Sequence, residues 1–95
     1  MIAIVSRNTV KEGKVEEFKK LTVELIEKSQ KEEGCIEYNL YQDLKNPRTL
    51  TFIEKWESEE AIEKHKNSKH FTSIVPKIKE LNESGELSLY DLAHK

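Results

Sequence analysis

Apolar residues recur along this chain with two different periods, that of a strand and that of a helix, and segments of the two kinds alternate. Four segments alternate between apolar and polar positions, which is typical of strands that bury one face: residues 2–10, 35–43, 50–56 and 86–93. Helical spacing begins after Gly13 and continues to about Glu33, and Gly34 follows as a stop signal. Residues 45–47 predict a turn, so the second and third strands are expected to form a hairpin.

A second helical region follows the third strand, and we expect it to be broken. Ser58 fits an N-cap, because Glu59 and Glu60 come directly after it at the positive end of a helix dipole. The apolar stripe restarts at Ser68 and passes through Pro76, which lacks an amide donor and is expected to kink or restart the helix.

The order of these elements is strand, helix, strand, strand, helix, strand. With right-handed crossovers, this βαββαβ order predicts an α+β, ferredoxin-like antiparallel sheet with the helices on one face. The first strand carries aliphatic residues on both sides, with Ile2 and Ile4 facing one way and Ala3 and Val5 facing the other. The uncovered face is therefore apolar, and a homodimer that packs sheet against sheet is expected to cover it.

The composition of the chain excludes some classes of binding partner. The chain has 95 residues, with 16 Lys and Arg against 18 Asp and Glu, and this length predicts one domain over residues 1–95. A balanced charge gives no footprint for the phosphates of nucleic acid. No stretch approaches the roughly 20 apolar residues of a membrane span. A single cysteine, Cys35, cannot form an internal disulfide, which agrees with a cytoplasmic location, and we interpret it as a small strand residue.

Common cofactor and nucleophile motifs are absent from the sequence, so the candidate chemistry rests on single residues. Those residues lie on the predicted strands and on the broken helix: Asn8, Tyr38, Glu54, Trp56, His65 and His70. Taken singly, the aromatic and histidine side chains are more often packing residues. Asn8 is the anomaly, because a strand interior disfavours asparagine and a buried asparagine needs hydrogen-bond partners.

The two histidines of the broken helix do not predict a metal site. On an unbroken helix, His65 and His70 would diverge by about 140° at 100° per residue. A break near Ser68 would bring them to one cavity, but no third ligand is evident in the sequence. We therefore expect no metal and no cofactor.

Four parts of the chain resemble the antibiotic biosynthesis monooxygenase family, including its small quinol monooxygenases: VKEGKVEEFKKL, EEGCIEYNLYQD, FIEKWESEEAIEKHKNSKHF and the region around Pro76. The combination of E-x-G-C-x-x-Y, E-x-W, A-x-x-x-H and S-x-H-F at these intervals is specific. The resemblance implies a dimeric α+β barrel with a small pocket between the sheet and the helices of each subunit. Its members include cofactor-free oxygenases, haem-degrading proteins and isomerases of sugar phosphates or lactones, so the fold does not fix the reaction.

Carried over by position, Asn8 corresponds to the pocket asparagine of the haem-degrading branch. His65 and Val75 stand where that branch has a tryptophan and a histidine, which argues against haem degradation. Trp56, His65 and His70 match recurrent motif positions of the quinol-type members, and the resemblance gives them pocket roles.

These observations lead to an expected function. We expect a cofactor-free monooxygenase that oxidises a small aromatic hydroquinone or polyketide-like substrate with molecular oxygen. A deprotonated hydroquinone reduces oxygen by itself, so the protein needs only to bind, orient and deprotonate it. His65 is expected to be the base and Asn8 a second catalytic group, and the expected substrate-binding residues are Tyr38, Trp56 and His70. The alternatives are an isomerase of a small sugar phosphate or lactone, and a non-catalytic ligand-binding stress protein.

Overall fold

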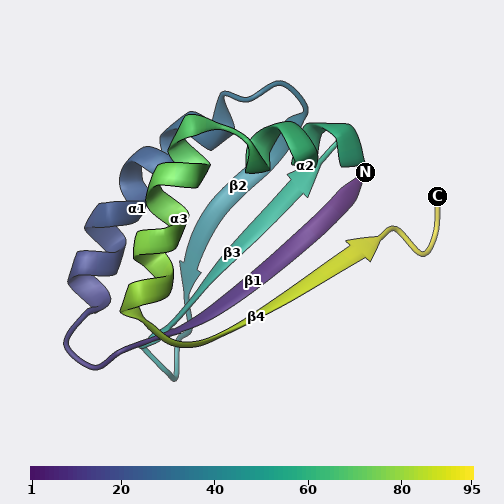
Figure 1. Ribbon diagram of the computed structural model, residues 1–95. Helices are drawn as coiled ribbons and strands as arrows, with labels where there is room; N and C mark the ends of the chain where they lie inside the picture. Colours follow the sequence, from purple (N-terminus) through teal and green to yellow (C-terminus); the bar gives the residue numbers. More distant parts are fainter.

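The computed structural model describes residues 1–95, and its elements follow the order expected from the sequence. These elements are β1 (Ile2–Val10), α1 (Val15–Gln30), β2 (Cys35–Gln42), β3 (Thr49–Trp56), α2 (Glu59–Lys66), α3 (Lys69–Leu81) and β4 (Asn82–Asp91). The four strands form one antiparallel sheet in the order β2-β3-β1-β4, and the helices lie over one of its faces (Figure 1). The predicted ferredoxin-like α+β fold is confirmed.

The hydrophobic core lies between the helices and the sheet face that they cover. On this face Ile4 of β1 stands opposite Glu54 of β3, and Asn8 stands opposite Leu50. Because side chains alternate along a strand, Phe52 and Trp56 share the face with Leu50 and Glu54. All of these residues are buried, so two polar side chains, Asn8 and Glu54, sit within a largely apolar layer.

The second helical region breaks at residues 67–68 rather than at its proline. Ser58 caps α2 by accepting a hydrogen bond from the backbone N–H of Ala61, and Ser68 caps α3 by accepting one from Phe71. Ser68 itself has an extended backbone, which redirects the chain between the two helices. Pro76 lies inside α3 without ending it. The predicted break at Ser68 is confirmed, and of the two effects expected at Pro76, a kink or a restart, the restart does not occur.

The end of α1, the start of β4 and the register of β2 differ from the sequence-based expectation. Helix α1 ends at Gln30 instead of Glu33, because the chain turns over residues 31–34. Gly34 ends this turn with a positive φ of 87°, and a Cβ there would lie 2.6 Å from the Cβ of Ala61. Strand β4 begins at Asn82 directly after α3, since residues 82–85 already pair with β1. In β2, Ile36 is an extra residue in the ladder to β3, so it is exposed while Tyr38 is buried.

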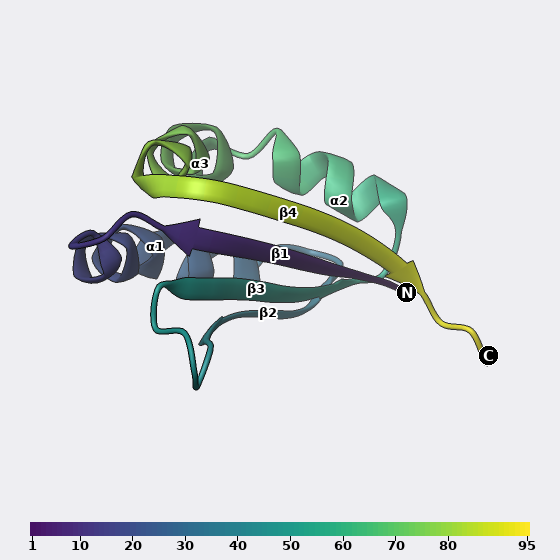
Figure 2. The same ribbon diagram turned by 90° about the horizontal axis from the view of Figure 1, so that it is seen from below.

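No helix covers the other face of the sheet, as expected. Its centre carries Ala3, Val5 and Ile53, which are half-buried, and Tyr41 and Tyr90 are exposed on it. Figure 2 shows the strands from below, with the C-terminal residues leading away from the end of β4. The three helices are each too short or too polar to cross a membrane.

Candidate functional site

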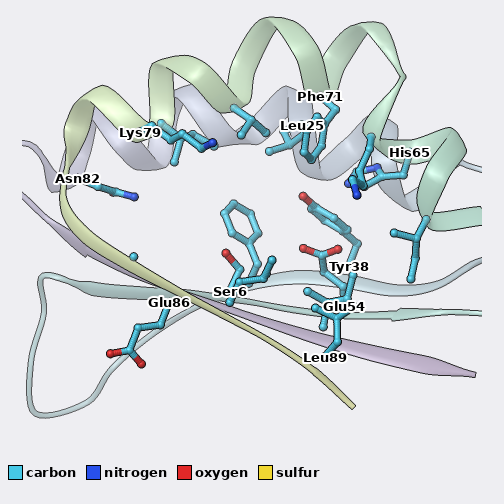
Figure 3. A pocket seen from close by; sticks show the side chains of 18 of the residues that line it. Ser6, Leu25, Tyr38, Glu54, His65, Phe71, Lys79, Asn82, Glu86 and Leu89 are labelled. Carbon is cyan, nitrogen blue, oxygen red and sulfur yellow. The ribbon is translucent and has the colours of Figure 1, made fainter. Parts of the chain in front are cut away.

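A cavity of about 620 Å³ opens between the covered face of the sheet and helices α2 and α3. All seven elements contribute to its walls, which include these residues: Ile4, Ser6, Leu25, Tyr38, Phe52, Glu54, Ile62, His65, Phe71, Val75, Ile78, Lys79, Asn82, Leu87 and Leu89. Figure 3 shows His65, Phe71, Tyr38 and Glu54 toward one end, and Lys79, Asn82 and Glu86 toward the other. Leu87 and Leu89 of the edge strand stay 67% and 56% exposed, so the cavity is open to solvent along β4.

His65 is the best-defined polar group of this cavity. It lies on the side of α2 that faces the sheet and is only 2% exposed. Its ring packs against Trp56 and Phe71, with ring centroids 4.6 Å and 5.0 Å apart. Its Nδ1 lies 2.6 Å from Oε2 of Glu32, whereas its Nε2 makes no hydrogen bond within the protein. Because His65 lines the cavity, Nε2 is the atom that remains for a bound molecule.

Glu32 joins two histidines from different helices. It lies in the turn after α1, and its Oε2 is also 2.9 Å from Nε2 of His70. Ser68, in the break between α2 and α3, donates a hydrogen bond to the backbone carbonyl of His65 at 2.6 Å. The break therefore brings the two histidine rings to a centroid distance of 6.1 Å, although they would diverge on a continuous helix.

The contacts of Glu32 assign the protons of this cluster. An ionised carboxylate only accepts hydrogen bonds, so Nδ1 of His65 and Nε2 of His70 carry the protons. Burial lowers the pKa of His65 below its usual value, and the hydrogen bond and charge of Glu32 offset part of this change. His65 is therefore neutral at pH 7, with a free lone pair on Nε2, which is the form that a general base needs.

Glu54 is a second titratable group in the same cavity. It is 6% exposed, and Oε1 accepts a hydrogen bond of 2.9 Å from Nε1 of Trp56. Burial raises the pKa of Glu54 to about 7, the charge of Glu32 adds to this change, and the bond from Trp56 opposes it. Burial and the charge of Glu54 in turn raise the pKa of Tyr38 far above its usual value. Tyr38 therefore stays a neutral phenol, while Glu54 takes both charge states near neutral pH.

Three predicted site residues do not line the cavity. Asn8 donates from Nδ2 to the carbonyls of Leu50 and Ser6, and its Oδ1 accepts from Asn82 at 2.7 Å, so its amide is occupied within the protein. Trp56 is fully buried behind Glu54 and His65, and His70 lies behind His65 on the far side of Glu32. Of the five site residues predicted from the sequence, the structure brings only Tyr38 and His65 to the cavity wall.

Comparison with known proteins agrees with this fold. The model of the family described as "Antibiotic biosynthesis monooxygenase" matches residues 1–77. The chain belongs to this family. It is 36% identical over 81 residues to a Bacillus subtilis protein named "Putative monooxygenase YcnE", which covers 85% of both chains.

Solved structures of the family give the same result. A conserved protein from Methanosarcina mazei superposes with a TM-score of 0.91 at 43% identity, covering 94% of this chain and 89% of its own. A structure described as an antibiotic biosynthesis monooxygenase superposes with a TM-score of 0.92 at 31% identity, covering 98% of this chain and 99% of its own. The resemblance found in the sequence is thus confirmed at the level of family and fold.

The family assignment does not reveal how Glu32 contributes. No third ligand beside the two histidines is evident in the sequence, but the ligand atoms of Glu32, His65 and His70 all lie within 4.8 Å of one another. Ligand atoms around a tetrahedral zinc ion stand about 3.3 Å apart, given bonds of about 2.0–2.1 Å. The separations of 2.6 Å and 2.9 Å are shorter and fit hydrogen bonds, so a metal would have to push the side chains apart.

Two residues escaped the sequence-based prediction. Glu32 belongs to the E-x-G-C run, but no spacing along the chain connects it to a histidine 33 residues later. Phe71 belongs to the apolar stripe of the second helical region, and only the break at Ser68 turns it toward His65.

Cys35 is a strand residue as expected, and burial, with the charges of Glu32 and Glu54, raises the pKa of its thiol to about 11. It is therefore no nucleophile at neutral pH.

Proposed function

We propose that this protein is a cofactor-independent monooxygenase that oxidises a small aromatic hydroquinone, or a polyketide-like hydroxyarene, with molecular oxygen. The observation that supports this proposal is the buried His65, whose Nδ1 is held by Glu32 while its Nε2 is left without a protein partner. A neutral histidine fixed in this tautomer accepts a proton from a phenolic hydroxyl.

The reaction that follows is balanced without a cofactor. The substrate hydroxyl gives its proton to Nε2 of His65, and the resulting phenolate is a strong electron donor. It reduces molecular oxygen, a C–O bond forms on the ring and the O–O bond breaks. One hydroquinone and one oxygen molecule thereby give one hydroxyquinone and one water molecule. The protein orients the ring and stabilises the developing oxyanion, for which the Tyr38 hydroxyl is the available neutral donor.

The shape and lining of the cavity support an aromatic substrate. Its volume of about 620 Å³ falls within the range of small-molecule pockets, roughly 300–1,000 Å³. Ile4 and Phe52 line it from the sheet, and Phe71 lines it from α3. The apolar side chains suit a planar ring, and the polar groups among them suit its hydroxyls.

A homodimer is part of the same proposal. The uncovered sheet face carries Ala3, Val5 and Ile53 at its centre, with Tyr41 and Tyr90 exposed beside them. A second copy that packs on this face removes the apolar surface from water. Light scattering at micromolar concentration is expected to give twice 11.1 kDa, and a mass of 11.1 kDa would contradict the dimer.

An isomerase is the second candidate. Two titratable groups, His65 and Glu54, line one cavity, and a shift of a double bond or carbonyl needs such a pair to remove and return a proton. This reaction consumes no oxygen, so it is separable from the first candidate.

The test is turnover of a panel of hydroquinones by purified, metal-free protein with and without air. We expect oxygen uptake and the hydroxyquinone product in air, and no product under anaerobic conditions. Product formation without oxygen would support the isomerase, and binding without turnover in either condition would leave a ligand-binding protein.

A further inference from the structure

One carboxyl group of the cavity has no part in the mechanism above. Glu54 lies at the centre of the sheet, where it stands opposite Ile4 on one side and Tyr38 on the other. Its Oε1 accepts the bond from Trp56, but no protein group bonds to Oε2. Oε2 is nevertheless accessible to solvent, and Glu54 lines the cavity. The free oxygen is therefore open to the cavity.

No cation neutralises this carboxyl group. The titratable groups near it are the Tyr38 phenol, the Cys35 thiol, Glu32 and His65, together with Lys66 and Lys79 on the helix side of the cavity. None of the lysines forms an ion pair with Glu54, and Lys66 pairs with Glu63 instead. On β4, Glu83 and Glu86 pair with Arg48 and Arg7.

We propose that Glu54 is a catalytic residue that binds the second hydroxyl of a dihydroxylated aromatic substrate through Oε2 and takes its proton during oxidation. The inference rests on the proposed function, and it restricts the substrate class to arenes with two hydroxyl groups. One hydroxyl faces Nε2 of His65 on the helix side, and the other faces Glu54 on the sheet side (Figure 3). The two protons removed from the substrate, one by each group, end in the water molecule formed from oxygen.

The chemistry of the carboxyl group suits this role. A buried carboxylate without a cation gains most from a hydroxyl donor, because the bond replaces lost hydration. Burial also raises the pKa of Glu54 to about 7, so the group accepts a proton from the substrate and releases it again near neutral pH.

The first measurement needs no turnover. Trp56 is the single tryptophan of the chain and bonds directly to Glu54, so its fluorescence reports the charge of this carboxyl group. We expect the fluorescence to change near pH 7 in the parent protein, and this change near pH 7 to be absent from Glu54→Gln. The transition of His65, which stacks on Trp56 and titrates at lower pH, is expected to persist in Glu54→Gln. Glu57→Gln, an exposed carboxylate just after β3, is the matched control and is expected to keep both transitions.

The second measurement is anaerobic binding of hydroquinone and of its monomethyl ether, which lacks one hydroxyl. At pH 8 the parent protein is expected to prefer hydroquinone by about tenfold or more, the effect of one hydrogen bond to a charged group. Glu54→Gln is expected to lose most of this preference, and Glu57→Gln is expected to keep it. A preference caused by the bulk of the methyl group alone would survive in Glu54→Gln and would overturn the proposal.

Two further outcomes are informative. If Glu54→Gln does not fold, Glu54→Asp withdraws the carboxylate by one methylene, and an unchanged preference in that variant would also overturn the proposal. Since both measurements are made without oxygen, a failure of the oxidation itself is distinguishable from a failure of Glu54. If no oxidation is found but the preference depends on Glu54, only the proposed function fails. If oxidation is found but the preference does not depend on Glu54, only the role of Glu54 fails.

Discussion

Two polar clusters lie near opposite ends of the cavity, and they differ in whether their central side chain keeps an atom without a hydrogen bond. At one end, Asn8 uses its amide to bind Leu50, Ser6 and Asn82, and every one of these partners belongs to the protein. At the other end, Glu32 holds His65 and His70, but Nε2 of His65 keeps its lone pair. The first cluster cannot change its charge, whereas the second can.

This difference explains why a buried polar residue is not by itself a sign of catalysis. The side chains of Asn8 and His65 both follow the rule that buried polar groups are hydrogen-bonded. Only a group with an unused atom facing a cavity, and with a pKa near the working pH, can exchange a proton with a substrate. We propose His65 as the working residue because its Nε2 is unused, whereas Asn8 joins β1, β3 and the start of β4 through its hydrogen bonds.

The largest effect is expected from removing the free nitrogen. His65→Ala should lower kcat by on the order of 10² or more, the usual contribution of a general base. The change should act on turnover per folded molecule, so kcat and the melting temperature are to be measured on the same sample. A packing histidine would show the reverse pattern, with a lower melting temperature and an unchanged kcat.

A smaller effect is expected from Glu32, which acts through His65. Glu32→Gln keeps the size of the side chain but removes its charge, and we expect kcat to fall by about tenfold because the tautomer of His65 is less well fixed. The hydrogen bond and charge of Glu32 raise the pKa of His65, so their loss lowers this pKa further. The acidic limb of the kcat/KM profile should therefore move to lower pH. A limb that stays in place or moves upward would show that Glu32 does not control His65.

The other cluster should respond in stability and not in turnover. Asn8→Ala leaves the carbonyl of Leu50 and the amide of Asn82 without their partner, which costs about 1–3 kcal/mol for a buried polar group. Urea unfolding is expected to show this loss, with kcat per folded molecule unchanged. A kcat that falls in proportion to that of His65→Ala would return Asn8 to the catalytic residues.

The smallest effect is expected from metal removal. The distances of 2.6 Å and 2.9 Å around Glu32 fit hydrogen bonds, so chelators should leave turnover intact. Turnover of chelator-treated protein is the measurement. Activity that disappears and returns with a stoichiometric metal would show that Glu32, His65 and His70 act as ligands.

The sequence predicted the fold far better than the site. Strand alternation and the serine caps are local signals, so the element order and the break at Ser68 could be predicted from short stretches. The start of β4 at Asn82 could not, because residues 82–85 show no apolar alternation and take strand geometry through pairing with β1. The exposure of Ile36 could not be predicted either, since a bulge shifts the alternation of side chains without changing the sequence pattern.

For the site, the sequence identified residue types but not their contacts. His65 follows Ala61 by one helical turn, a spacing that puts both residues on the sheet side of α2, and both are buried there. Asn8 was an anomaly for a sound reason, but its partners Leu50 and Asn82 are 42 and 74 residues away. Glu32 was missed because a glutamate in a turn looks like a solvated surface residue.

The tautomer of His65 tests the central claim most directly. Nitrogen NMR of protein labelled at its three histidines, assigned with His65→Ala, reports which ring nitrogen carries the proton. At pH 7 we predict a neutral His65 with its proton on Nδ1 and a bare Nε2, and a shift of the Nε2 resonance when hydroquinone is added without oxygen. A proton on Nε2, a doubly protonated ring, or an Nε2 resonance that ignores the ligand would contradict the assignment of His65 as the base.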